Sequence, residues 1–257
     1  MFGIVFLILI IFAILTFWYK QVVCEFRINQ IEWNQRNANI RELLTEKVPI
    51  VLRGIPTISL WTCEDVMMRS CYANIKIFED KTLSDWIAVS DNTAICPWKR
   101  THAEQLGNVN GLSTWAEKWL NQEIMRGSFS RFWYKPVYSC WAGDMGLQKT
   151  LAQWTCIFVS EGSIQVSLLT QEMAYALPSP WKGCFPMNLT NHDTPFAGEL
   201  KVLDIIVRPG NCLLVPAHWF MAWQSCKEEK TCPMVCMISY HTPMSRLATA
   251  ISKHATI

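Results

Sequence analysis

The chain has 257 residues and a net charge of +2, and only 17% of its residues are charged. This composition excludes a nucleic-acid-binding protein, because phosphate recognition needs clustered cations, and the length favours one domain with a full hydrophobic core. Eleven cysteines, an odd number without the compact spacing of small secreted domains, indicate reduced and buried thiols.

The first residues of the chain, Met1 to Tyr19, carry no charged side chain and end in three aromatic residues. As a helix this segment would be about 28 Å long, and aromatic residues are enriched at membrane interfaces. It lacks the basic start and the small-residue cleavage site of a signal peptide. We therefore expect residues 1–20 to be a transmembrane anchor, and the cations that follow predict a single-pass membrane protein with a cytoplasmic domain.

The remaining chain is expected to contain a juxtamembrane helix at 21–45, where apolar residues recur at helical spacing, and one domain at 46–257. In that domain the apolar run Val48 to Leu52 predicts a strand. Thr62, followed by two acidic residues, predicts the start of one helix, and Ser113-Thr114 predicts the start of another.

From Pro136 onward the sequence is mostly β. Alternating or continuous apolar runs predict strands at 137–141, 154–160, 163–169, 201–207, 212–215 and 234–240. Between two of them, Leu177 to Gly198 is rich in Pro, Gly, Asn and Asp and predicts a long loop of functional or mobile character. Helices in the first half and strands in the second predict an α+β domain whose sheet is a closed or half-closed barrel.

Three sequence blocks, in order, resemble the Jumonji-C and cupin-like hydroxylases over approximately Val48 to Ser245. They read VPIVLRGI, CWAGDMGLQKTLAQW and VRPGNCLLVPAHWFMAW. The first is similar to an early strand of that family, the second to the strand that leads into its Leu-His-x-Asp metal motif, and the third to the Pro-Gly turn, strand and bend that supply the last ligand. The resemblance implies a cupin-like (double-stranded β-helix, or jelly-roll) barrel with N-terminal helices, holding Fe(II) and 2-oxoglutarate.

The residues that the resemblance places at the metal positions are not metal ligands. Non-haem Fe(II) oxygenases use two His and one carboxylate, whereas the matched positions here are Ala152, Trp154 and Met221. A neighbouring register puts Lys149 and Leu151 in place of the first two. The strand GSIQVSLL also lacks the basic residue that the family uses to bind 2-oxoglutarate.

Ala, Trp and Met are residue types that can fill an emptied cavity, where a void would cost stability. We therefore expect a degenerate site without catalytic residues, metal or cofactor. The residues expected around the barrel mouth, as a possible pocket, are Trp141, Lys149, His218 and Trp219.

Other residues with possible chemistry are weaker candidates. The pair His102 and Glu104 is expected to lie in a solvated loop. The spacing of Cys226, Cys232, Cys236 and His241 fits no standard zinc site. Cys140 is the nearest candidate for a nucleophile, and we expect it to be part of a strand core.

The sequence thus predicts a membrane-anchored, catalytically inactive cupin-like domain that acts as a binding or scaffold module. Its partner at the barrel mouth would be a protein or a small ligand, and the N-terminal helix would contact the membrane. The alternative is an active Fe(II)/2-oxoglutarate-dependent dioxygenase with displaced ligands. A third reading is a sugar- or small-ligand-binding cupin that uses the aromatic mouth without metal.

Overall fold

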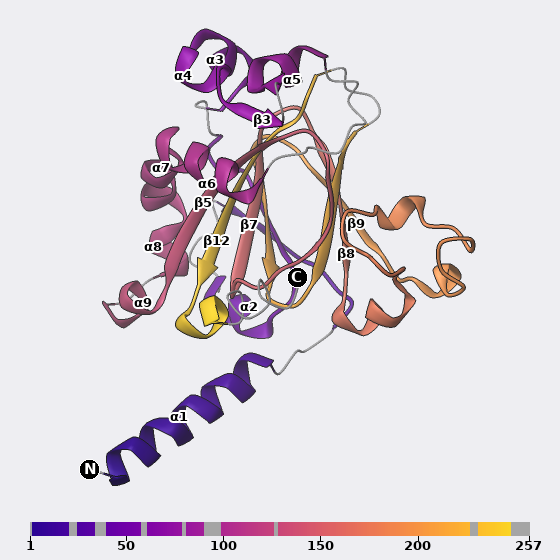
Figure 1. Cartoon of the computed structure of the whole chain (residues 1–257). Helices are drawn as coiled ribbons and strands as arrows, with labels where there is room; N and C mark the ends of the chain where they lie inside the picture. Colours follow the sequence, from indigo (N-terminus) through magenta and orange to yellow (C-terminus); the bar gives the residue numbers. More distant parts are fainter. Residues whose placement is uncertain are drawn as a thin grey trace.

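The computed structural model describes residues 2–20, 25–33, 40–57, 61–78, 81–89, 99–125, 128–226 and 231–247. Its architecture is mixed α+β (Figure 1). Two larger β-sheets face each other, and helices from the first half of the chain pack outside the larger one.

The larger sheet has six strands in the order β1-β2-β10-β7-β12-β5. Its neighbouring strands are antiparallel, except that β1 and β2 are parallel. The central strands β7 and β12 consist mainly of β-branched, aromatic and sulfur-containing residues, which suit a pleated surface buried on both faces. The strands are β1 (Asn29–Glu32), β2 (Ile50–Arg53), β5 (Lys135–Ala142), β7 (Trp154–Glu161), β10 (Asn211–Pro216) and β12 (Met234–His241).

The second sheet has four antiparallel strands in the order β6-β11-β8-β9. Each strand alternates its side chains between the two faces, so one set points toward the larger sheet and the other points away. These strands are β6 (Met145–Lys149), β8 (Ile164–Leu169), β9 (Leu203–Val207) and β11 (Phe220–Ser225). A separate two-stranded sheet consists of β3 (Lys76–Phe78) and β4 (Lys81–Thr82).

The helices of the described residues are short, apart from the first. They are α1 (Phe2–Lys20), α2 (Ile40–Glu46), α3 (Cys63–Met68), α4 (Ser70–Ala73), α5 (Leu83–Val89), α6 (Arg100–Val109), α7 (Leu112–Trp119), α8 (Asn121–Ile124) and α9 (Ser128–Trp133). Three 3₁₀ helices, η2 (Gln171–Ala176), η3 (Pro186–Asn188) and η4 (Ala197–Glu199), lie in the long connection between β8 and β9. The predicted helix start at Thr62 is confirmed, because its side chain caps α3 by accepting a hydrogen bond from Asp65 N.

Helices α6 and α7 cover the outer face of the larger sheet. On α7, Trp115 stacks on Phe158 of β7, with the ring centroids 4.8 Å apart. On α6, Gly107 lies so close to β5 that a Cβ at this position would overlap the backbone of Tyr138 and Ser139. A glycine is therefore required for the contact between helix and sheet.

We expect the substitution Gly107→Ala to lower the free energy of unfolding by about 1–3 kcal/mol, because the added methyl group forces α6 away from β5. Chemical denaturation would measure the loss. Gly198→Ala is the matched control, since a Cβ there meets no atom within 4 Å. Equal stabilities of the two variants would contradict the close approach of α6.

The inner faces of the two sheets pack against each other through large side chains. Trp141 of β5 meets Trp223 of β11 edge to face, with the ring centroids 6.4 Å apart. The outer face of the smaller sheet carries a second apolar cluster, in which Phe220 meets Trp181 from the long connection at 4.9 Å. The long loop predicted between Leu177 and Gly198 is thus present, and it covers this sheet.

The predicted closed barrel is wrong. Hydrogen bonding of the described strands gives separate sheets, in which β1 and β5 are the edges of the larger one and β6 and β9 are the edges of the smaller one. The fold class is therefore mixed α+β with facing sheets, and the cupin-like barrel is not formed. Sequence alternation led to the error, because inward and outward positions alternate in the same way in a barrel and in two facing sheets.

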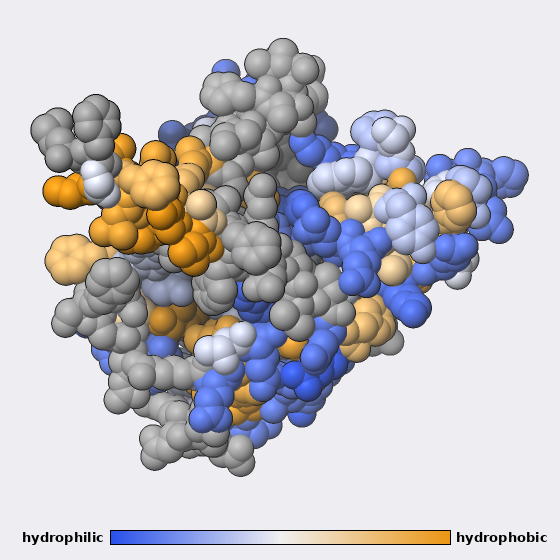
Figure 2. Space-filling model, turned by 90° about the horizontal axis from the view of Figure 1, so that it is seen from below, coloured by the Kyte–Doolittle hydropathy of each residue, from blue (hydrophilic) through white to orange (hydrophobic). Residues whose placement is uncertain are grey.

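The transmembrane prediction is also wrong: among the described residues, no helix has both the length and the apolar character needed to cross a membrane. The anchor predicted for 1–20, and the single-pass membrane localisation derived from it, are therefore incorrect. Exposed apolar side chains nevertheless gather over α1, among them Ile4 and Leu7 (Figure 2).

The helix predicted for 21–45 is replaced, where the structure describes it, by strand and helix. β1 occupies Asn29–Glu32 and pairs with β2, and α2 begins only at Ile40. The shortness of β1 explains why a helix was predicted here. A four-residue strand with every second residue exposed has too few positions to distinguish the two-residue period of a strand from the 3.6-residue period of a helix. Residues 21–24 and 34–39 of the predicted helix lie outside the described residues.

Candidate functional site

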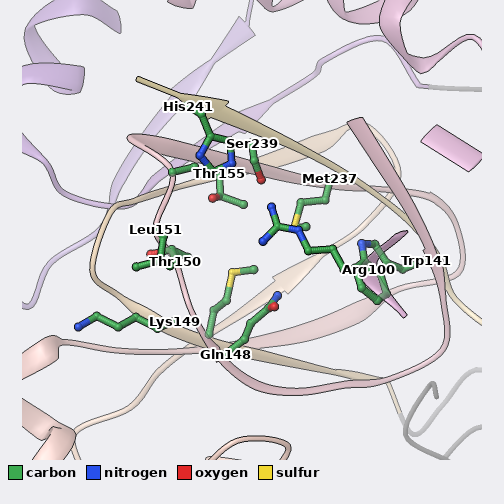
Figure 3. Close-up of a pocket in the computed structure, with 12 residues that line it drawn as sticks. Arg100, Trp141, Gln148, Lys149, Thr150, Leu151, Thr155, Met237, Ser239 and His241 are labelled. Carbon is green, nitrogen blue, oxygen red and sulfur yellow. The ribbon is translucent and has the colours of Figure 1, made fainter. Parts of the chain in front are cut away.

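A cavity of about 80 Å³ lies between the two sheets at one end of the fold (Figure 3). Its lining combines polar and thioether side chains from both sheets with one cation from α6. The residues are Arg100, Trp141, Gln148, Lys149, Thr150, Leu151, Ala152, Thr155, Met221, Met237, Ser239 and His241.

The wall formed by the larger sheet comes from alternate positions of β12 and from β7. Met237, Ser239 and His241 are spaced by two residues, so they share the inner face of β12. Ser239 lies directly opposite Thr155 of β7 in the strand register. Both residues are buried, and within the described part of the chain neither side-chain hydroxyl has a hydrogen-bond partner. Two unpaired hydroxyls therefore face the same small space.

The opposite wall comes from the smaller sheet. Gln148 of β6 pairs in register with Met221 of β11, and both line the cavity. The amide nitrogen of Gln148 lies 3.0 Å from the sulfur of Met145. Since this is a weak interaction, the amide oxygen of Gln148 keeps its full capacity to accept a hydrogen bond.

The rim of the cavity is fixed by Thr150, which follows β6. Its hydroxyl contacts the carbonyl oxygens of Pro216 and Trp219 at 2.7 and 3.1 Å and receives the backbone N–H of Trp219 at 3.1 Å. Its carbonyl accepts from the backbone N–H of His218, which adopts a left-handed φ of 71°. These bonds tie the bend between β10 and β11 to the connection between β6 and β7.

Arg100 is the first residue of α6 and brings a positive charge to the cavity. Figure 3 shows its guanidinium group extending among the lining side chains, toward the middle of the space. Its Nε donates to Glu104 Oε1 at 2.7 Å, one turn along the same helix, and its side chain is 43% exposed. Among the described residues, its two terminal nitrogens have no hydrogen-bond partner.

His241 closes the other side of the cavity and is buried. Burial first, and then the charges of Arg100 and Arg246, lower the pKa of His241 from 6.5 to about 4. The imidazole is therefore neutral at pH 7. Its Nδ1 lies 3.2 Å from the hydroxyl oxygen of Ser245.

Lys149 contributes less to the cavity than its position suggests. Figure 3 shows its amino group pointing away from the other lining side chains. The nitrogen lies 5.6 Å from the ring centroid of Phe220, on the outer face of the smaller sheet. Partial burial lowers the pKa of the Lys149 amine. Arg100 is thus the cation that faces the interior.

The structure brings together some of the residues predicted for a degenerate site. Ala152 and Met221 both line the cavity, as do Lys149 and Leu151 of the neighbouring register and Trp141 of the predicted mouth. The remaining predicted residues, Trp154, His218 and Trp219, are not among its lining residues.

Trp154 is separated from the cavity by strand alternation. It precedes Thr155, whose side chain lines the cavity, so the indole lies on the opposite face of β7, where it is buried. His218 and Trp219 lie in the bend after β10, which Thr150 holds. Ala152, Trp154 and Met221 therefore do not converge on one point.

Several polar residues of the cavity were not predicted from the sequence. The sequence indicated His241 only as a possible zinc ligand, and it indicated no role for Thr155, Ser239 and Arg100. The available signal was the pair Ser239 and His241, two positions apart in a buried strand, because polar side chains at successive inward positions of such a strand are unusual. Arg100 gave no such signal, since it comes from a helix outside the strand pattern.

The lining does not fit the iron and 2-oxoglutarate site that the resemblance implied. A facial site for Fe(II) needs two imidazoles and a carboxylate, whereas this cavity offers one imidazole, hydroxyls, an amide and thioethers. Within the described residues, no group of three or more His, Cys, Asp or Glu side chains is placed to hold a metal ion.

The predicted thiol candidates lie away from the cavity. Cys140 and Cys236 oppose each other on β5 and β12, with their sulfur atoms 3.8 Å apart, and Asn110 donates to Cys140 Sγ at 2.7 Å. Burial raises the pKa of the Cys140 thiol well above its usual value, so it stays protonated and weakly nucleophilic at neutral pH. Cys236 and His241 face opposite sides of β12, so these two of the residues weighed as a zinc site do not point to a common centre.

No protein family matches the chain, and no curated protein matches it at a significant level.

Proposed function

We propose that this protein is a non-catalytic binding domain whose cavity takes a small organic acid, with the carboxylate bound by Arg100. The observation that carries the proposal is the position of the Arg100 guanidinium, whose terminal nitrogens face a cavity with two unpaired hydroxyls. Arginine binds carboxylates through two parallel N–H donors, and hydrogen bonds to an ionised group are about twice as strong as neutral ones.

The unpaired hydroxyls of Thr155 and Ser239 support the same ligand. Neither hydroxyl oxygen is among the fully buried side-chain atoms of the described residues that lack a hydrogen bond, so both are reachable from the cavity. Each hydroxyl can donate one hydrogen bond to an occupant with acceptor oxygens. A carboxylate can accept from Arg100 and from one or both hydroxyls at the same time.

The cavity volume limits the size of the ligand. It is about 80 Å³, roughly half that of the 150 Å³ cavity known to admit benzene. The ligand therefore has about three to five non-hydrogen atoms. At roughly 1 kcal/mol per atom, the dissociation constant is expected to be on the order of 1 mM.

The chemistry of the lining favours binding over catalysis. It contains no thiol and no carboxylate, and its one imidazole is neutral and bonded to Ser245. A hydroxyl nucleophile needs an adjacent base within hydrogen-bond reach, but Thr155 and Ser239 have no such partner among the described residues.

Isothermal titration calorimetry of the full chain tests the proposal. Acetate should bind, and acetamide, which has the same shape without the charge, should not. Arg100→Met is expected to weaken acetate binding by about 10-fold or more, the loss expected for hydrogen bonds to a charged group. Arg208→Met is the control, because Arg208 is exposed and does not line the cavity.

Two results would overturn the proposal. One is the absence of binding by any carboxylate of this size at concentrations up to tens of millimolar, with ionic strength held constant by chloride. The other is an equal affinity of wild-type protein and Arg100→Met for acetate.

A further inference from the structure

The hydrogen bonds around Ser245 determine which nitrogen of His241 carries the proton. The Ser245 hydroxyl oxygen accepts from the backbone N–H of Thr242 at 2.9 Å, and its single proton is donated to the Thr242 carbonyl at 3.0 Å. With the hydroxyl proton directed at that carbonyl, Nδ1 of His241, 3.2 Å from the same oxygen, is the donor of the pair. The neutral ring then has its proton on Nδ1, and Nε2 is an acceptor only.

The cavity is therefore polarised between two unlike ends. Arg100 can only donate hydrogen bonds, whereas Nε2 of His241 can only accept them. Thr155 and Ser239 lie on the wall between these ends, and Ser239 is two residues before His241 on β12. A ligand that is complementary to the whole cavity presents oxygen acceptors toward Arg100 and a hydrogen-bond donor toward His241.

The small size of the cavity brings these two requirements close together. In about 80 Å³, a molecule of about three to five non-hydrogen atoms has room for a carboxylate and one neighbouring substituted carbon. A donor on that carbon must be uncharged, because a cationic amine would be repelled by Arg100. Among uncharged donors, a hydroxyl group adds a single non-hydrogen atom and is therefore the one that best suits this volume.

We infer that the cavity selects small 2-hydroxy acids over the corresponding acids without the hydroxyl, because Nε2 of His241 accepts a hydrogen bond from the hydroxyl group. This inference rests on the proposed function, because it assumes that the carboxylate binds at Arg100. Ser245 bonds to Nδ1 and does not itself line the cavity, so its role is that of a positioning residue.

Glycolate and acetate provide the direct test, since they differ only in the hydroxyl group. In calorimetric titrations of the full chain we expect glycolate to bind about 10-fold more tightly than acetate. Acetate leaves the Nε2 acceptor without a donor, and this costs affinity of that order. His241→Phe, which keeps a ring of similar size without an acceptor, should bring the two affinities within about twofold. Ser245→Ala should also reduce the preference, because the proton can then move to Nε2.

Nitrogen-15 NMR of the imidazole gives a readout that does not depend on the variants folding. Wild-type protein at pH 7 should show a protonated Nδ1 and an unprotonated Nε2 for His241. A protonated Nε2 would overturn the inference and leave the proposed function intact.

The failures of the two proposals are distinguishable. If neither acid binds, the proposed function fails and the inference fails with it. If both bind with equal affinity and Arg100→Met weakens both, the proposed function stands and the hydroxyl selectivity is refuted.

Discussion

Replacing Trp223 with alanine is expected to lower the free energy of unfolding by about 3–5 kcal/mol, as for other fully buried tryptophans. The indole is 1% exposed and fills the space between the two sheets, where it meets the edge of Trp141. Its Nε1 also donates to the Gly143 carbonyl at 3.0 Å. Truncation leaves a cavity and removes this hydrogen bond.

Urea denaturation would measure the change from the shift in midpoint at constant m-value. Trp223→Phe keeps most of the volume and should cost clearly less than the alanine variant. Phe132→Ala is a surface control, since Phe132 is 91% exposed and its loss should stay within about 0.5 kcal/mol. A cost below about 1.5 kcal/mol for Trp223→Ala would contradict the packing of the two sheets.

Acidification should destabilise the protein by about 2–3 kcal/mol between pH 7.5 and 4.5 through His241 alone. The pKa of this residue falls from 6.5 to about 4 on folding, so the unfolded chain binds a proton in this window that the folded protein does not. Stability from the neutral imidazole is therefore fully present above pH 6.5 and is lost as the pH falls toward 4. One pKa unit corresponds to about 1.36 kcal/mol, which sets the size of the effect.

The measurement is a series of urea denaturations across this range, in buffers without acetate or other small carboxylates. His241→Gln cannot titrate, and its loss of stability over the same range should be smaller by about 2 kcal/mol. Arg100→Met removes one of the charges that lower the pKa of His241, so its loss should be intermediate. Parallel pH profiles for wild-type protein and His241→Gln would show that His241 is not a buried neutral imidazole.

Most strands of the second half were predictable, because their signals are local. β10 and β12 were recognised as apolar runs bounded by Pro and Gly, and the turn before β10 contains Gly210 with a left-handed φ of 88°. β11 was not recognised as a strand, because Phe220 to Trp223 is apolar on both faces and shows no alternation. Which strands pair with each other depends on residues far apart in the sequence. The barrel prediction was wrong because it required a pairing between the two sheets that local signals do not determine.

Predicting the candidate site required the exact register of each strand, whereas predicting the strands did not. Placing Trp154 in the cavity required a register that differs by one residue from the observed one, and such a shift moves a side chain to the other face of a strand. Thr155 occupies the inward position instead. The role of His241 depends on Ser245, four residues later, and on Arg100, more than a hundred residues earlier, and no spacing rule connects such positions.

The position of β12 within the larger sheet has a consequence for how the protein folds during synthesis. β12 is the last strand of the described chain, yet it lies between β7 and β5, pairing Met234 with Ala142 across 92 positions of sequence. Until it leaves the ribosome, β5 and β7 have unpaired backbone edges lined with apolar side chains. Such edges are templates for aggregation, and pairing over this distance is slow. The nascent chain is therefore expected to depend on chaperones until Met234–His241 has emerged.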